Sequence, residues 1–555
     1  MKKMKKTLSL LLFVLLFCLS YAGAQSVDVD NYTDFSANFT SASEITINLS
    51  SGIAYTSPWA TMGNANKTIN GNNFSLIGGG VSGSNLTVNR TGRTLTLTDI
   101  TLQNMNIAVY VQAGTLSING NVNFTSNATV SNGGAIYIAG SNSFLNFENG
   151  SNVTFTNNNG FVGGAVYVAS YANLTADGSV IIFSSNTATS TNGGGLRLYS
   201  YASAVFTDSN ISFTGNIANG TASGTGGGAI AMADADLDFI RSTAAFTSNT
   251  AKSGGAIHIG SSGNKLNFSS STAYFTGNIS SGTTTSDGGG AIYAGNGAVL
   301  SFSGSAVTFT SNTARAGGAV YITGTNTSLN FLNSLAAFNY NTAKSSGGAI
   351  YADSSVNLSF AGSTVTAIGN EAENGGGFLY FNNRNITFDS NITLTNNTAQ
   401  AGGAIYANLA TAGSLTFSGN SSVFNYNTAK SSGGAIYAVG SSSRNINFSN
   451  NVFFTGNEAY IGGAMFLDNR TITTFQSGSN AVFAGNRAVA GGAIYARGNA
   501  NLSFINSTVM FTSNTANNDG GAISVLGSGV SLNFSSSVVS FAGNTANVGG
   551  AIMYV

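Results

Sequence analysis

Three carboxylates alternate with apolar residues in one short stretch of the 555-residue chain. Asp234, Asp236 and Asp238 are separated by Ala235 and Leu237, and alternate residues of a strand face the same side. Such a group could supply the acid pair used in glycoside hydrolysis, or several oxygen ligands for calcium. Because neighbouring repeats, described below, carry no matching acids, we favour a solvated acidic face. A cation site and a catalytic site stay as alternatives.

Aromatic hydroxyls recur more widely. A tyrosine follows a Gly-Gly-Ala-Ile-like segment in eight of fifteen copies. If these segments are strands, the tyrosines point outward and form an amphipathic strip that binds a sugar or a protein partner. The alternative is that stacked tyrosines stabilise an exposed parallel sheet. The residues are Tyr137, Tyr167, Tyr293, Tyr321, Tyr351, Tyr406, Tyr437 and Tyr495.

Two copies carry other polar side chains at the tyrosine position, namely Arg197 and His258. His258 is the only histidine of the chain and has no evident partners for a metal site or a catalytic triad. We therefore predict that both are surface substitutions. The sequence indicates no catalytic residue, no metal site and no cofactor.

The elements that position these residues are set by a repeat. Double glycines recur every 27 to 35 residues, and nearly every one follows a Phe-x-x-Asn segment by about ten residues. A fixed period in this range is typical of a solenoid. The double glycines begin at Gly133, Gly163, Gly193, Gly227, Gly254, Gly289, Gly317, Gly347, Gly375, Gly402, Gly433, Gly462, Gly491, Gly520 and Gly549.

Each period holds three short alternating stretches separated by Gly, Asn and Ser, and none reaches helical length. The sequence therefore predicts an all-β fold, a right-handed parallel β-helix with about 30 residues and three strands per coil. In its Gly-Gly-Ala-Ile-Tyr strands, Ile136 is expected to point inward, and Ala135 and Tyr137 outward.

Equivalent residues of successive coils should stack directly. We expect an internal phenylalanine column beginning Phe124, Phe155, Phe183 and an asparagine ladder at one corner. Ala367–Asn370 and Leu394–Asn397 lack the phenylalanine, and Gly375-Gly-Gly-Phe378 places Phe where Ile usually stands. We expect that a phenylalanine has exchanged positions, with Phe378 compensating for a missing ring. The coils near residues 367–397 are therefore predicted to be irregular. The asparagines are Asn127, Asn158, Asn186, Asn216, Asn249, Asn278, Asn312 and Asn341.

The ends of the chain differ from the repeats. Four lysines, an apolar stretch Leu8–Leu19 and Ala22-Gly-Ala24 predict a signal peptide over residues 1–24. Its removal leaves 15 basic and 19 acidic residues, a net charge of −4, and no cysteine. Neither disulfides nor a basic nucleic-acid surface is then expected, and no internal apolar run is long enough for a transmembrane helix.

The rest of the chain divides into two parts. We assign residues 25–120 to an N-terminal cap with irregular first coils, and 121–555 to the repeats. The last copy ends at Val555 within a coil, so we expect a fragment or a covered edge.

The paired motifs resemble the repeats of chlamydial-type polymorphic outer membrane proteins. Examples are Phe309-x-x-Asn312 with Gly317-Gly-Ala-Val320, and Phe454-x-x-Asn457 with Gly462-Gly-Ala-Met465. The resemblance covers residues 121–555 and implies an autotransporter passenger, a β-helical stalk displayed on the outer surface for adhesion. Two features depart from that family, since no membrane barrel follows and the mature chain lacks cysteine. A truncated gene, a secreted relative and repeats borrowed by another exported protein all stay open.

Together these observations predict a non-enzymatic, exported adhesin or structural stalk, at the cell surface or outer membrane or released outside the cell. Its expected partner is a glycan or protein on a host or environmental surface. The alternative is a secreted polysaccharide lyase or glycoside hydrolase on the same scaffold. Residues 338–352 and 424–438 are identical. Since the fold does not require this identity, we infer recent duplication or exchange of coils.

Overall fold

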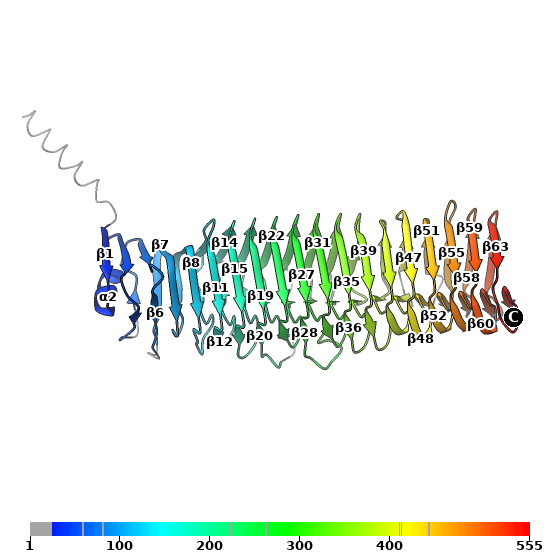
Figure 1. Ribbon diagram of the computed structural model, residues 1–555, viewed down its shortest axis with the longest axis horizontal. Coiled ribbons are helices and arrows are strands. Elements are labelled where there is room, and N and C mark those ends of the chain that lie inside the picture. Colours follow the sequence, from blue (N-terminus) through cyan, green and yellow to red (C-terminus); the bar gives the residue numbers. More distant parts are fainter. Residues whose placement is uncertain are drawn as a thin grey trace, which may run out of the picture.

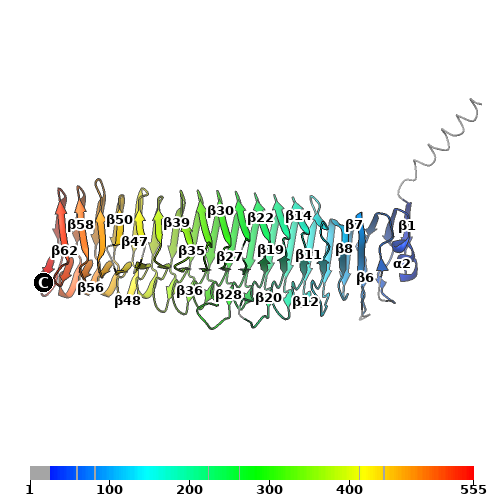
Figure 2. The ribbon, with the colours of Figure 1, turned by 180° about the vertical axis from the view of Figure 1, so that it is seen from behind.

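The chain forms a straight β-solenoid of about 17 turns with roughly 29 residues per turn (Figure 1 and Figure 2). The structure is a computed structural model that describes residues 25–57, 60–79, 83–222, 224–261, 263–409, 411, 413–441 and 444–555. The signal peptide predicted for residues 1–24 lies outside the described residues. With 56% strand and 2% helix, the predicted all-β parallel solenoid is confirmed.

One coil shows how the repeat folds. It contains β33 (Val320–Ile322), β34 (Ser328–Leu332) and β35 (Leu335–Asn339), followed by the two-residue β36 (Thr342–Ala343). β33 pairs in parallel with β37 (Ile350–Ala352), the same strand of the next coil, without a register shift. The three expected strands are present, and a short fourth strand follows the asparagine.

The strands stack into long parallel sheets. The short fourth strands form a sheet of their own, with 13 strands running from β12 (Asn159–Gly160) to β60 (Thr515–Asp519). The second strands change sheet partway along the rod. No ladder joins β38 (Asn357–Ser359) to β42 (Asn385–Phe388), and a separate six-stranded sheet continues from β42 to β62 (Ser531–Ser535). This break lies in the predicted irregular region, which is thereby confirmed.

Phenylalanine rings fill the core as predicted. The rings of Phe124, Phe155 and Phe183 follow one another at 4.9 and 4.7 Å, nearly parallel. A second column from the preceding strands meets the first edge-on, as between Phe239 and Phe246 at 6.4 Å and 87°. Offset-stacked and edge-to-face contacts are the arrangements that aromatic quadrupoles favour.

The asparagine ladder is also confirmed. In a typical coil the backbone N–H of Asn312 and its Nδ2 both donate to Oδ1 of Asn341, at 3.0 and 2.9 Å. The same Nδ2 donates to the carbonyl of Phe275 at 2.9 Å. The pattern runs from Asn127 to Asn544, so a buried corner that would otherwise hold unpaired polar groups is satisfied coil by coil.

The irregular coil corrects the predicted register. Gly376, at φ +65°, is the first glycine of the pair, so Phe378 occupies the alanine position and Leu379 the isoleucine position. The alanine position faces inward, because a Cβ at Gly195 would stand 3.0 Å from the ring of Phe213. Phe378 therefore fills the space left by the missing phenylalanine at Ala367, with its ring 5.4 Å from Phe338. The expected compensating swap is correct.

The outward orientation expected for Ala135 is wrong. Ala135 is fully buried and belongs to the hydrophobic core. It precedes strand β9 (Ile136–Ile138), so the alternation that governs strand residues begins only after it. Both Ala and Ile of the Gly-Gly-Ala-Ile segment consequently face the core.

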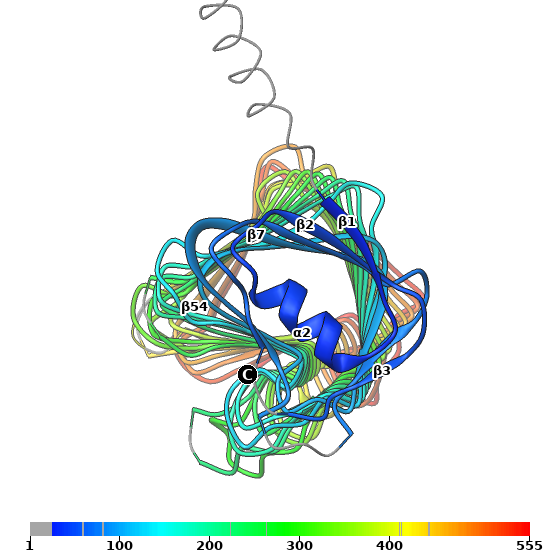
Figure 3. The same ribbon diagram turned by 90° about the vertical axis from the view of Figure 1, so that its left-hand side faces the viewer.

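One helix lies at the N-terminal end of the rod. After β1 (Gln25–Val29), helix α2 (Tyr32–Thr40) crosses the opening of the first turns (Figure 3). Its side chains Phe35 and Phe39 are fully buried, and Asn31 caps it by accepting a hydrogen bond from the Asp34 N–H at 3.0 Å. Helix α2 thus covers the end of the rod. The assignment of residues 25–120 to a cap stays a prediction.

Candidate functional site

The predicted tyrosines stack in a column, interrupted in some coils, on the outside of the first strand of each coil. Neighbouring rings from Tyr293 to Tyr437 lie 4.6–5.6 Å apart and nearly parallel. Tyr110 and Tyr380 also belong to the column. Sequence reasoning missed Tyr380 because the triple glycine at residues 375–377 hid the correct register. Its signal was the Phe378-Leu-Tyr380 segment after that glycine run.

The column is covered along much of its length. Tyr167, Tyr321 and Tyr495 are only 7–8% exposed, and the other predicted tyrosines are half-buried. The residue before the double glycine of one coil lies against the ring of the next coil, as Gly288 does against Tyr321 and Gly375 against Tyr406. Burial raises the pKa of the Tyr167 hydroxyl to about 12. The rings thus present edges rather than faces to solvent.

Arg197, Ala231 and His258 interrupt this column in three successive coils. The prediction that Arg197 and His258 are surface substitutions is wrong, since they are 8% and 2% exposed. The His258 ring stacks on Tyr293 at 4.8 Å, and the residue packs against Gly226 and Gly260, which have no side chain to occupy that space. Burial, with a smaller effect of Arg197, lowers the pKa of His258 to about 3, so the imidazole is neutral.

The three aspartates do not share one strand face as expected. Asp234 stands at a corner with φ +51°, and only Asp236 and Asp238 lie on strand β22 (Asp236–Ile240). An Asp236 oxygen is 3.9 Å from Nζ of Lys265, and Asp238 accepts a hydrogen bond from Asn267 Nδ2 at 2.7 Å. In the described part of the chain, no group of three or more His, Cys, Asp and Glu side chains is placed to hold a metal ion.

An exposed aromatic pair lies beside these aspartates. The rings of Tyr171 and Tyr201 stack at 4.8 Å and 12° and are 57% and 63% exposed as residues. Next to Tyr201 is a hollow of about 370 Å³, lined also by Ser203, Asp234 and Asp236. Sequence reasoning missed this pair because it lies outside the glycine motif. The available signal was the Ser-Tyr-Ala segment that recurs after thirty residues at 170–172 and 200–202.

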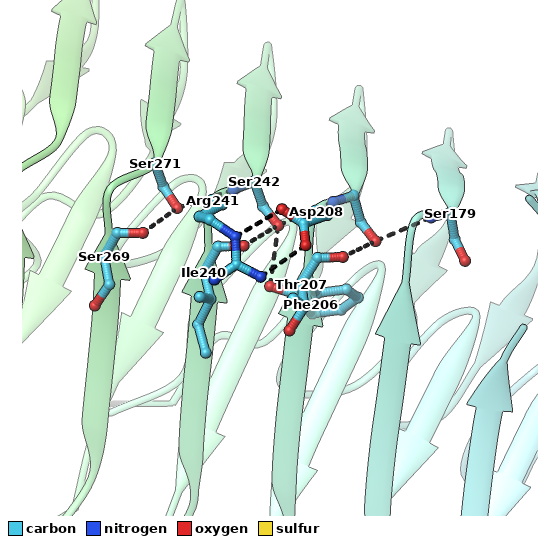
Figure 4. A network of polar contacts seen from close by, with 10 residues as sticks. Ser179, Phe206, Thr207, Asp208, Ile240, Arg241, Ser242, Ser269 and Ser271 are labelled. Atoms are coloured by element: carbon cyan, nitrogen blue, oxygen red, sulfur yellow. Dashed lines mark hydrogen bonds and ion pairs between the residues drawn. The ribbon is translucent and has the colours of Figure 1, made fainter. Parts of the chain in front are cut away.

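A second polar ladder runs along the next corner (Figure 4). The N–H of Ser242 donates to Oγ of Ser271 at 3.1 Å, and Ser242 Oγ donates to the carbonyl of Ile240 at 3.0 Å. On the same corner Arg241 donates to both carboxylate oxygens of Asp208, at 2.9 and 2.7 Å. The hydrogen bond from Arg241 lowers the pKa of Asp208. This exposed ion pair links adjacent coils, and Arg241 is directed to Asp208 rather than to the aspartates of β22.

Another hollow of about 670 Å³ lies on the 13-stranded sheet, where Lys430, Glu458, Tyr460 and Arg487 contribute charges of both signs and one ring. No stacked aromatic pair is found among its lining residues within the described chain. No helix in the described residues is long and apolar enough to cross a membrane.

The family comparison agrees with the repeat geometry. The model of the Chlamydia polymorphic membrane protein repeat matches residues 306–323, 336–353, 385–408, 414–439, 480–497 and 508–525. Most of these segments run from the strand that carries the core phenylalanine to the strand after the double glycine. Comparison with curated proteins and with solved structures gave no match. Six segments of the chain therefore match the Chlamydia polymorphic membrane protein repeat, which confirms the resemblance predicted from the sequence.

Proposed function

We propose that the chain is a non-enzymatic adhesin or stalk, exported and displayed at the cell surface in the manner of an autotransporter passenger. The observation that carries this proposal is the occurrence of polymorphic membrane protein repeats on an uninterrupted β-solenoid. A rod of this kind separates its two ends and presents side chains at regular intervals. Weak contacts repeated along it add through effective concentration.

The internal ladders support a stiff rod. Every coil from Asn127 to Asn544 is tied to the next by an asparagine whose amide bonds both neighbours. The phenylalanine columns and the tyrosine column bridge the same coils. Because each coil depends on its neighbours, bending at one coil would disturb several contacts at once.

The tyrosine column has a place in this proposal. Its rings stack on one another, which supports a stabilising role along the outer sheet. The half-buried members Tyr137, Tyr293, Tyr351, Tyr406 and Tyr437 retain accessible edges that are proposed to add contacts to a glycan or protein on a host or environmental surface. Proposed locations are the outer membrane, with attachment to it, or the extracellular medium.

The proposal is tested on cells that produce the full chain. Antibody labelling of intact and permeabilised cells should give equal signals, and these cells should adhere to host or abiotic surfaces better than cells without the protein. Labelling only after permeabilisation, or unchanged adhesion, would contradict it. Incubation of the purified chain with polyuronides tests the enzymatic alternative, and cleavage of any of them would overturn the non-enzymatic assignment.

A further inference from the structure

The strongest unassigned feature is the corner that carries Tyr171 and Tyr201. These residues occupy the same position in successive coils, just before β14 (Asn173–Asp177) and β18 (Ser203–Thr207). In the following coil the equivalent position holds Asp234. Two large rings are therefore followed by the short side chain of Asp234, and the stack of rings ends there.

Tyr171 and Tyr201 have a backbone conformation that is unfavourable for tyrosine. Tyr171 and Tyr201 have φ of +61° and +63°, in the left-handed region that large L-residues avoid. Other coils place asparagine or glycine at the same position, namely Asn142, Gly263, Gly297 and Asn326.

Burial offers the tyrosines little compensation, because more than half of each residue is exposed. Their ring-to-ring contact at 4.8 Å is the one interaction between them that favours this placement. Residues held in an unfavourable conformation without burial are characteristic of binding surfaces.

The hollow of about 370 Å³ lies at the end of this stack, between Tyr201 and the short side chain of Asp234. Tyr201 forms one wall, Ala202 and Ala235 contribute small apolar side chains, and the carboxylates of Asp234 and Asp236 supply acceptors. Asp236 Oδ1 accepts a hydrogen bond from the Lys265 N–H at 3.1 Å. The carboxylate of Asp234 accepts none from the residues that the structure describes.

An aromatic wall beside hydrogen-bond acceptors fits a ring with an apolar face and hydroxyl donors at its rim. A pyranose has this form, since its axial C–H bonds cover a face and its hydroxyls project around the edge. Placed against Tyr201, a pyranose would continue the stack where the next coil offers only Asp234. The two carboxylates disfavour an anionic sugar by repulsion, and the nearby ammonium of Lys265 already faces Asp236.

We propose that Tyr201, supported by Tyr171, binds a pyranose residue of a neutral glycan, with Asp234 and Asp236 accepting hydrogen bonds from its hydroxyls. This assignment rests on the proposed adhesive function and names the chemical class of its ligand. Tyr171 acts as a positioning residue, since its ring lies behind that of Tyr201.

The test is affinity electrophoresis of the full exported chain through gels that contain dextran, galactomannan, mannan or hydroxyethyl cellulose. At least one of these neutral polysaccharides should retard the wild-type chain. Tyr201→Ala should weaken retardation by about tenfold or more, as expected for truncation of a central aromatic contact, and Tyr201→Phe should keep it. Asp234→Tyr should abolish binding by filling the third position with a ring.

Tyr426→Ala is the matched control, because Tyr426 is 58% exposed, also has positive φ and lies at a different corner. It should bind as the wild type does. Thermal unfolding of every variant verifies that the rod is intact. Absence of retardation by all four neutral polysaccharides, or unchanged binding by Tyr201→Ala, would overturn the proposal. Retardation confined to pectin or heparin gels, and lost in Tyr201→Ala, would overturn its assignment to a neutral ligand.

Adhesion of cells producing the wild type and Tyr201→Ala separates this inference from the proposed function. If wild-type cells adhere while the gels show no glycan binding, the site assignment fails and the adhesive function stands. If wild-type cells do not adhere, the proposed function fails whatever the gels show.

Discussion

Replacement of one ladder asparagine in the middle of the rod, Asn312→Ala, should loosen several coils. The change removes both bonds donated by Asn312 Nδ2 and the two that Asn278 donates to Asn312 Oδ1 at 3.0 Å. It leaves the N–H of Asn278 and one amide hydrogen of Asn278 unpaired in a buried corner, while the carbonyl of Phe275 stays in the parallel ladder with β31 (Ala306–Thr310). At about 1–3 kcal/mol for each of the two buried unpaired groups, the local cost is about 2–6 kcal/mol.

Hydrogen exchange followed by mass spectrometry measures this cost where it arises. Local opening free energies govern exchange of protected amides, so peptides covering residues 272–345 should exchange at least about thirtyfold faster. Peptides covering 480–519 should be unchanged, because contacts in a solenoid reach only adjacent coils. Asn330→Ala is the control, since Asn330 lies outside the core with one 3.5 Å side-chain contact. Equal effects of the two substitutions, or faster exchange along the whole rod, would refute the reasoning.

Three further predictions concern a corner glycine, the compensating phenylalanine and the buried histidine. Gly318→Ala should abolish soluble expression because its Cβ would stand 2.1 Å from the carbonyl oxygen of Gly348, whereas Gly485→Ala, with open space around it, should cost only about 1 kcal/mol in denaturant unfolding. Phe378→Ala should cost about 3–5 kcal/mol, and a double-mutant cycle with Ala367→Phe should recover part of that loss; additive effects would refute the swap. His258 is neutral in the fold but takes up a proton when unfolded, so wild-type stability should fall by about 4–5 kcal/mol as pH drops from about 6.5 to about 3. His258→Tyr should lack that component in thermal unfolding across this pH range, and identical pH profiles would contradict it.

The fold was predictable from sequence because the asparagine and the phenylalanine of each Phe-x-x-Asn segment define the register of the coils. Asn127 and Phe124 recur with nearly constant spacing, and their equivalents stack directly. The prediction failed where spacing alone was ambiguous. In Gly375-Gly-Gly-Phe378 any two of three glycines can be the pair, and only the positive φ of Gly376 identifies it.

The candidate site was less predictable, because exposure in a solenoid depends on the neighbouring coil. The outward position of Tyr321 follows from strand alternation, but its burial follows from Gly288 one coil earlier. His258 is buried for the same reason, through Gly226 of the preceding coil. Tyr171 and Tyr201 each stand eight residues after the first glycine of their pair, but this corner varies in length in other repeats, as at Asp234, seven residues after Gly227. The glycine motif therefore does not locate the position in every coil.

The division between inward and outward positions explains where recognition can reside in such a rod. Core residues and the asparagines and serines of the corner ladders must match those of adjacent coils, so they carry structure and little specificity. The identical segments 338–352 and 424–438 repeat their outward side chains as well, including the exposed Tyr340 and Tyr426. Departures from the repeat instead concentrate in the coils from Val166 to Gly263. There Arg197, Ala231 and His258 interrupt the tyrosine column, and the exposed pair ends at Asp234. The asparagine ladder continues through these coils without interruption, so it does not depend on the departing side chains. Of these departures, Arg197 and His258 are buried, whereas Tyr171 and Tyr201 are exposed, so the exposed pair is the one placed to meet a ligand, as the proposed glycan site requires.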